Sequence, residues 1–362
     1  MKVVVFIGLV AVWTAMAKLW LRANNFSTRT RRTVFTTAVA VTAALLSVSF
    51  WSDPQIQPSD LGQVWAGARA LLHGQNPYDV VGPGRPFEWS WPLLYPLTAP
   101  LTLLPFAWLP LRWTDPLFVG IGFGLFAWAV TARRDTMPAL LGLASLPGLM
   151  ALQTSQWSPL MTAAALLPAL GWVLIAKPTI GLAFFTAYPR WKTAVGCALM
   201  LVFSFVVWPG WLPEWLATFD SAPHIIAPVV RPGGFLVLLA LLRWKRPEAR
   251  LLAALACVPH TTVPYETIPL FLIPQTWLQS FALWCCAGLA YIAQAYTGPY
   301  FTQLDYWTSG AKFIVLLMYL PCTAMVLSRP NAWPARDEDT TTIDSAGRVC
   351  RRVDQGRLPD AA

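Results

Sequence analysis

The sequence predicts an all-α, polytopic helical membrane protein, and three observations support this fold class. Hydrophobic residues make up 56% of the 362 residues, whereas charged residues make up only 12%. Mean hydropathy is +0.51. Apolar runs long enough to cross a bilayer as helices recur along the chain, and they predict about eleven transmembrane helices. A soluble chain of this length would carry about twice as much charge.

Basic residues gather in the short loops between these runs, and they predict the topology. Loops rich in Lys and Arg remain on the cytoplasmic side of a membrane. The net charge of +9 therefore reflects which loops face the cytoplasm in a multi-pass protein of the cell membrane. The sequence contains no basic patch interleaved with aromatic residues, so a nucleic-acid partner is not indicated. The clusters are Arg22, Arg29, Arg31 and Arg32; Arg133 and Arg134; Arg190 and Lys192; and Arg243, Lys245, Arg246 and Arg250.

The first apolar run, at 3–21, precedes the first basic cluster without a small-residue cleavage pattern. It predicts a retained span rather than a cleaved signal peptide. The run at 34–51 then crosses back, so residues 52–92 are expected to form an outer loop. Residues 1–328 are expected to form one transmembrane domain, and residues 329–362 a polar, disordered cytoplasmic tail.

Two later stretches bear on the topology. Residues 93–111 are apolar but contain four prolines, which predict a surface or re-entrant segment rather than a clean span. The run at 160–176 is expected to cross inward as one span. It would place Lys177 at the cytoplasmic face, where a lysine side chain can extend toward water.

The segment that begins at Asp60 predicts a short amphipathic helix. Apolar residues recur at helical spacing from Leu61 to Leu72, and Gly74 follows as a C-terminal stop. Asp60 has two interpretations. It is a favoured helix N-cap, and Gln63 three residues later would complete a capping-box-like pair. Alternatively, it is a base that takes a proton from a hydroxyl at the membrane surface, because charge beside hydrocarbon is costly and usually marks a site.

His260 is the second candidate for chemistry. It lies near the end of an apolar run, on the side predicted for Asp60, and Tyr265 and Glu266 follow it closely. Its imidazole is either hydrogen-bonded inside the bundle or part of a site, because ionisable groups within a membrane are expensive. Glu266 either orients His260 or faces the outer water.

Five sequence blocks follow one another in a characteristic order. SDLGQVWAGARALLHGQNPYD at 59–79 precedes WPLLYPLTAPLTLLPFAWLP at 91–110, and QWSPL at 156–160, AKPTIGL at 176–182 and VPHTTVPYE at 258–266 follow. In this order and placement they resemble glycosyltransferase family 87, the polyprenol-phosphate-mannose-dependent mannosyltransferases with the GT-C fold. The likeness extends over residues 33–330 and is densest at 58–110. The chain departs from the family in its compact length and in a short region before Lys177.

The resemblance implies an inverting transfer of a hexose, mannose by expectation, from a polyprenyl-phosphate donor to a glycan or glycolipid acceptor on the extracytoplasmic side. Asp60 would deprotonate the acceptor hydroxyl, and His260 would bind the donor phosphate or the acceptor. No cofactor is implied, although a divalent metal stays compatible with the pattern; the six cysteines form no spaced metal motif. The remaining candidates for substrate binding are Glu266, Tyr265, Arg69, Tyr95, Gln156 and Lys177.

Two other classes of function were weighed against an enzyme. A multi-pass transporter or flippase for a lipid-linked or small polar substrate predicts internal repeats and interrupted helix pairs, but the sequence contains no repeat of fixed period. A membrane scaffold gives no reason for Asp60 and His260 to share one side of the membrane. The sequence therefore favours an enzyme, with the transporter as the alternative.

Overall fold

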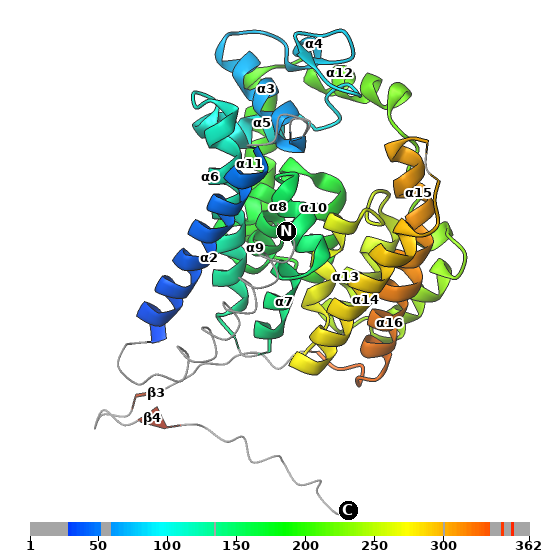
Figure 1. Ribbon diagram of the computed structural model, residues 1–362. Coiled ribbons are helices and arrows are strands. Elements are labelled where there is room, and N and C mark those ends of the chain that lie inside the picture. The colour runs from blue at the N-terminus through cyan, green and yellow to red at the C-terminus, as the bar shows by residue number, and fades with distance from the viewer. Residues whose placement is uncertain are drawn as a thin grey trace, which may run out of the picture.

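The computed structural model describes residues 28–51, 59–133, 135–299, 301–333, 342–343 and 349–350. Figure 1 shows a bundle of helices with a layer of short helices over one end. The all-α prediction is confirmed for these residues, in which strands occur only as short pairs. The parallel pair is β1 (Val81–Gly82) with β2 (Phe87–Glu88), and the antiparallel pair is β3 (Thr342–Ile343) with β4 (Val349–Cys350). The predicted first span at 3–21 and most of the predicted tail lie outside the described residues.

Four helical segments among the described residues are long and apolar enough to cross a membrane. They belong to α2 (Thr28–Trp51), α6 (Leu111–Val130), α14 (Trp277–Ala295) and the continuous run of α15 (Gln303–Ile314), η8 (Val315–Tyr319) and α16 (Leu320–Leu327). A fifth arises if α11 (Trp191–Val207) and α12 (Trp211–Ala217), which bend by 96°, count as one span. The membrane class is thereby supported, whereas the larger number of spans predicted from the sequence is not confirmed.

The remaining helices from residue 137 to residue 272 are shorter, and several of them correspond to apolar runs. Helical periodicity alone does not distinguish such segments from membrane spans when they follow one another closely. These elements are η2 (Met137–Ala139), α7 (Leu140–Leu143), α8 (Leu146–Gln153), α9 (Ser158–Leu166), η3 (Pro168–Ala176), α10 (Pro178–Ala187), η4 (Thr218–Ser221), η5 (Pro228–Val230), η6 (Gly234–Arg243), α13 (Pro247–Cys257) and η7 (Pro264–Leu272).

Helices α2 and α6 pack closely because α6 presents two glycines to its neighbour. A Cβ at Gly120 would lie 2.9 Å from the Ala40 carbonyl oxygen, and a Cβ at Gly124 would lie 2.8 Å from the Ala40 Cβ. Small residues four apart allow two membrane helices to approach along their backbones. This contact places the start of α6, with its buried Asp115, beside the start of α3 (Asp60–Leu72).

The apolar run at 160–176 folds back on itself instead of crossing once. Pro168 lacks a backbone N–H and ends the α-helical path, so α9 is followed by η3, which packs beside it. The turn between them lies at the level of Arg190, whose Nη1 donates to the Leu166 carbonyl over 3.1 Å. At the other end of η3, the Ile175 carbonyl accepts a 2.8 Å hydrogen bond from Thr98.

This hairpin overturns the predicted position of Lys177. Thr98 lies on α5 (Thr98–Leu103), in the layer of short helices that contains α3. Lys177 follows Ile175 by two residues, so it lies at the end of the bundle that carries Asp60. The prediction of a single crossing, with Lys177 at the opposite face, was wrong because an uninterrupted apolar run also fits two short antiparallel helices.

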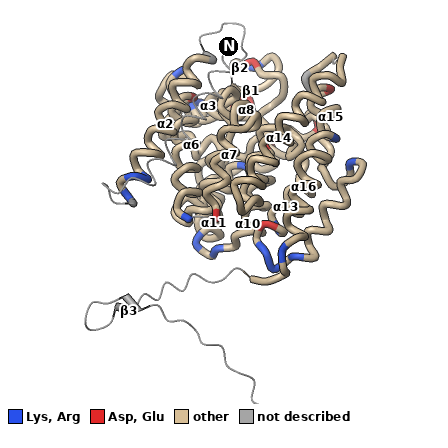
Figure 2. Tube along the Cα trace, turned by 60° about the horizontal axis from the view of Figure 1, so that its bottom comes forward, with Lys and Arg blue, Asp and Glu red and all other residues tan. Residues whose placement is uncertain are grey.

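Described arginines of the predicted basic clusters lie at the other end of the bundle, where four of them donate to carbonyls near helix C-termini. Figure 2 shows blue segments along the lower edge, beside α10, α11 and α13. Arginines near helix C-termini satisfy the last carbonyls and oppose the negative end of the helix dipole. The carbonyls that accept are Trp128 from Arg32, Leu166 from Arg190, Ala187 from Arg250, and Leu327 from Arg243.

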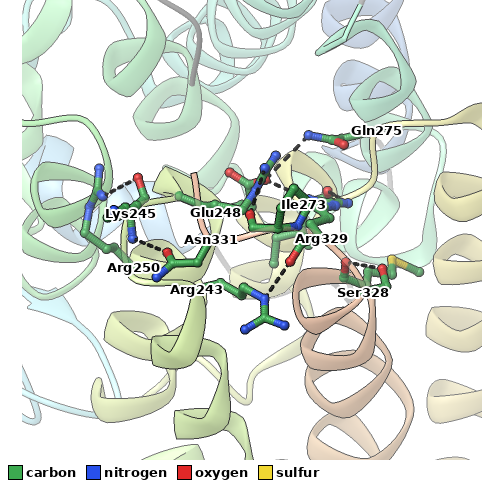
Figure 3. A network of polar contacts seen from close by, with 12 residues as sticks. Arg243, Lys245, Glu248, Arg250, Ile273, Gln275, Ser328, Arg329 and Asn331 are labelled. Carbon is green, nitrogen blue, oxygen red and sulfur yellow. Dashed lines mark hydrogen bonds and ion pairs between the residues drawn. The ribbon is translucent and has the colours of Figure 1, made fainter. Parts of the chain in front are cut away.

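A buried ionic network closes this basic end, as Figure 3 shows. Glu248 Oε1 accepts from Arg246 Nε over 2.7 Å and from Arg329 Nη1 over 2.8 Å. Arg329 Nη2 also donates to the Ile273 carbonyl over 2.7 Å. Arg329, which was predicted to begin the tail, is buried within the bundle. The folded domain therefore extends past the predicted boundary at residue 328.

The opposite end of the bundle is covered by α3, α4 (Pro77–Val80), α5, η1 (Leu104–Phe106) and α12 (Figure 1). A small core holds this layer together, with Tyr78, Leu93, Leu97 and Trp211 among its buried members. Helix α3 is buried on most of its surface. It therefore lies within the top of the bundle.

Candidate active site

Asp60 is the first residue of α3, and it does not cap that helix. The N-cap position belongs to Ser59, and no side-chain capping bond is formed there. The interpretation of Asp60 as an N-cap with Gln63 is therefore wrong. The Asp60 side chain instead points away from its own helix and contacts residues about one hundred and two hundred positions later in the chain.

Two side chains donate hydrogen bonds to the Asp60 carboxylate. Gln156 Nε2 donates to Oδ2, and the Tyr265 hydroxyl donates to the same oxygen over 3.4 Å. Burial raises the pKa of the Asp60 carboxyl above its ordinary value, while the Lys177 charge and these two hydrogen bonds oppose the rise. A carboxylate with a raised pKa that keeps its hydrogen-bond partners is suited to accept a proton near neutral pH.

A second carboxylate, Glu266, lies next to this group in an ion pair. Lys177 Nζ contacts Glu266 Oε1, and Ser158 Oγ donates to Glu266 Oε2 over 2.6 Å. The Glu266 side chain is 1% exposed and the Lys177 side chain 17% exposed. Lys177 is therefore the less buried partner of this ion pair.

Tyr95 completes this cluster, and its ring faces Lys177. Lys177 Nζ lies 5.8 Å from the Tyr95 ring centroid, within the range of a cation–π contact. Tyr95 also packs against Trp157, with 6.3 Å between ring centroids. The structure thus joins six of the predicted site residues in one group, called here the Asp60 cluster: Asp60, Tyr95, Gln156, Lys177, Tyr265 and Glu266.

His260 lies beside the Asp60 cluster, in the turn that joins α13 to η7. Its φ of 74° is unusual for a residue with a side chain. Burial lowers the pKa of its imidazole, and the Lys177 charge lowers that pKa further. A neutral imidazole donates through one nitrogen and accepts through the other. The charges of Lys177 and Glu266 both act on His260, which lies near these members of the Asp60 cluster.

Arg69 is the one predicted site residue that the structure keeps away from the Asp60 cluster. It lies in the last turn of α3, and its guanidinium stacks 5.0 Å from the ring of Trp65 on the same helix. This contact fixes the charge on the helix surface, about two and a half turns from Asp60. No contact in the described residues connects Arg69 to Asp60.

Sequence reasoning missed Asp115, which supports the backbone that carries Asp60. Asp115 on α6 is fully buried, and its Oδ1 accepts a 2.7 Å hydrogen bond from Ser59 Oγ. Ser155, the neighbour of Gln156, has a φ of 53° and lies beside the same carboxylate. Asp115 thus lies beside Ser59, which precedes Asp60, and beside Ser155, which precedes Gln156. An acid inside the apolar run at 111–130 was the available signal.

Buried polar atoms without partners, both acceptors and donors, lie in and around the Asp60 cluster among the described residues. The cluster contains two carboxylates, those of Asp60 and Glu266, and one ammonium group from Lys177. Gln156 Oε1 is buried without a hydrogen-bond partner among the described residues, and so is Asp115 Oδ2. Buried polar groups without partners are uncommon, and each calls for an explanation such as a catalytic role, a bound water or a bound ion. The arrangement can accept a proton from a hydroxyl group and can place one cation against an anionic group.

No group of three or more His, Cys, Asp or Glu side chains in the described residues is arranged to hold a metal ion. Comparisons with known proteins add no further constraint on the site. No family model, no curated protein and no solved structure matches the chain.

Proposed function

We propose that this chain is an integral membrane glycosyltransferase that moves a hexose from a polyprenyl-phosphate donor to a glycan or glycolipid acceptor on the extracytoplasmic side. The observation that carries the proposal is the Asp60 carboxylate, held by Gln156 and Tyr265 beside the Lys177–Glu266 ion pair. Its support from sequence is the family 87 resemblance, because the quoted blocks include all of these residues.

The proposed reaction is a single displacement. The acceptor oxygen attacks the anomeric carbon while its proton moves to the Asp60 carboxylate. The bond between the anomeric carbon and the phosphate oxygen breaks, and the polyprenyl phosphate leaves with the bonding electron pair. The leaving phosphate is already a stable anion, so it needs no general acid. The configuration at the anomeric carbon inverts, because nucleophile and leaving group occupy opposite faces.

The other members of the Asp60 cluster bind and orient in this scheme. Lys177 contacts the donor phosphate and stabilises its growing charge. Glu266 holds Lys177 in place and Ser158 holds Glu266. Neutral His260 donates a hydrogen bond to the donor phosphate or to the acceptor. Tyr95 and Tyr265 line the sugar position. The raised pKa of Asp60 strengthens the base.

A donor panel tests this function directly. The purified chain in proteoliposomes is supplied with polyprenyl-phosphate mannose, polyprenyl-phosphate glucose or a nucleotide-linked mannose, together with a lipid and glycan extract as acceptor. We expect hexose transfer and release of free polyprenyl phosphate from a lipid-linked donor only. Transfer from the nucleotide-linked sugar, or no cleavage of any donor, contradicts the proposal.

A transporter or flippase is the second candidate, and the broken segment formed by α9, η3 and α10 favours it. Interrupted helices that end at charged residues are typical of transporters, and Lys177 lies at such an interruption. The same proteoliposomes separate the two functions. A flippase moves the intact donor between leaflets, whereas a transferase cleaves it.

A further inference from the structure

A cavity lies in the layer of short helices, outside the Asp60 cluster. Its volume is about 310 Å³, at the lower end of the roughly 300–1,000 Å³ of small-molecule sites. The segment from Tyr78 to Pro92 forms most of its wall, and Ser221 at the end of η4 closes it. The β1–β2 pair shapes this wall, and Gly82 adopts a φ of 145° beside Pro92.

The lining of this cavity combines aromatic rings with hydrogen-bonding groups. Trp91 and Tyr78 supply rings, Ser90 and Ser221 supply hydroxyls, and Arg85 supplies a guanidinium. The described lining contains no carboxylate. Arg85 lies 3.5 Å from Asp79, but both side chains are at least half exposed, so this ion pair is weak and leaves donors for a ligand. A saccharide presents C–H faces to rings and hydroxyl edges to such polar groups.

One short segment connects the cavity to the Asp60 cluster. Trp91 lines the cavity and Tyr95 belongs to the Asp60 cluster, and four residues span at most about 14 Å. The Tyr78 hydroxyl, from the cavity wall, donates to the Tyr95 carbonyl over 3.3 Å. Trp215 Nε1 donates to the Leu94 carbonyl over 3.0 Å and fixes the same segment. A short oligosaccharide covers this separation.

We propose that this cavity binds the saccharide part of the acceptor, a few sugar units from the hydroxyl that receives the hexose. The inference rests on the proposed function, because it assigns a place to that reaction's acceptor. The inference also assigns different roles to two neighbouring tryptophans. Trp91 lines the cavity, whereas Trp89 packs on Phe87, with 6.3 Å between ring centroids. Trp91 is therefore the residue that stacks on sugar, whereas Trp89 contributes no surface to the cavity.

Direct binding tests this site without requiring catalysis. The full chain carrying Asp60→Asn is placed in lipid nanodiscs, and dissociation constants are measured for linear oligosaccharides of mannose, glucose, galactose and arabinose, one to five units long. We expect binding that tightens with length for at least one series. Trp91→Ala should weaken that binding by about tenfold or more, because it removes an aromatic anchor.

Trp89→Ala is the matched control, and it should leave the same dissociation constant within a factor of two. Trp91→Phe keeps a ring and should retain most of the affinity, which separates stacking from a folding defect. The proposal is overturned if no series binds, or if Trp89→Ala weakens binding as much as Trp91→Ala. If oligosaccharide binding depends on Trp91 but the wild-type chain cleaves no donor, the transferase function is refuted and the binding site is not. If the chain transfers hexose but Trp91→Ala does not change the acceptor KM, the acceptor site in this cavity is refuted and the transferase function is not.

Discussion

The bundle contains two buried ionic groups at opposite ends, and they differ in how completely they are satisfied. At the basic end, Glu248 accepts from two guanidinium groups, and Arg329 also donates to the Ile273 carbonyl. Arg243 and Arg250 cap neighbouring helices. The Glu248 carboxylate there accepts from two cations, and Arg329 also donates to a backbone carbonyl.

The Asp60 cluster has the opposite balance. Two carboxylates share one ammonium group, and, among the described residues, Gln156 Oε1 within the cluster and Asp115 Oδ2 beside it are buried without partners. A satisfied ionic group at helix ends stabilises the fold, whereas an unsatisfied one at the mouth of a bundle is poised for a ligand. The difference teaches that burial and charge alone do not mark a site. Unmet hydrogen-bonding capacity is what distinguishes the Asp60 cluster from the Glu248 network in the described residues.

The largest effect expected from this contrast is on stability, at the basic end. Glu248→Gln leaves Arg329, 8% exposed, without its buried counter-charge, and loss of one partner of a buried pair costs about 3–5 kcal/mol. Glu266→Gln should destabilise the chain less, because Lys177 is more exposed, but it should reduce transfer more. Unfolding in detergent and initial transfer rates measure the two effects. Equal effects of the two variants on stability and on transfer rate would contradict the proposed difference between the two ionic groups.

The next effect concerns the support under Asp60. Asp115→Leu removes the acceptor of the Ser59 hydroxyl and lets the start of α3 shift, and a displacement of about 1 Å can cost roughly 100-fold in rate. We expect kcat to fall about 10- to 100-fold, with little change in donor KM. Asp115→Asn keeps an acceptor oxygen and should restore most of the rate. Loss of equal size in both variants would point to the charge of Asp115 rather than to its hydrogen bond.

The smallest effect is a shift in pH dependence. Asp60 must be ionised to act as a base, so the rate should fall as pH decreases through its raised pKa. The Lys177 charge opposes that rise in the Asp60 pKa, so Lys177→Met should move the acid limb of kcat/KM to higher pH. Lys192→Met, an exposed lysine at the basic end, should leave the limb in place. A shift to lower pH would show that Lys177 does not act on the base.

Sequence reasoning predicted the membership of the Asp60 cluster better than its geometry. Acids beside apolar runs indicate Asp60 and Glu266, whereas Gln156 is indicated only by the family 87 resemblance, and the three residues lie in one group. The position of Lys177 was missed because the apolar run at 160–176 was taken as one span, although Pro168 inside it signals a break. Periodicity cannot decide between one long helix and two short antiparallel ones, since both bury every face.

The role of Asp60 within α3 was ambiguous for a similar reason. A capping residue and a base are both acids at a helix start, and only tertiary contacts separate them. Ser59 takes the capping position in the fold, and Gln156 and Tyr265 engage the Asp60 carboxylate. Those partners lie on α8–α9 and η7, so no local pattern around Asp60 could reveal them.

The most direct test of the central claim is the transfer rate of Asp60→Asn in proteoliposomes with the lipid-linked donor. Asn keeps the acceptor oxygen for Gln156 and Tyr265 but cannot take a proton. We expect the rate to fall about 10²- to 10⁴-fold, with thermal unfolding and donor binding unchanged, and Asp135→Asn, an exposed acid, to retain full activity. An Asp60→Asn variant that keeps more than about a tenth of the wild-type rate would contradict the assignment of Asp60 as the base.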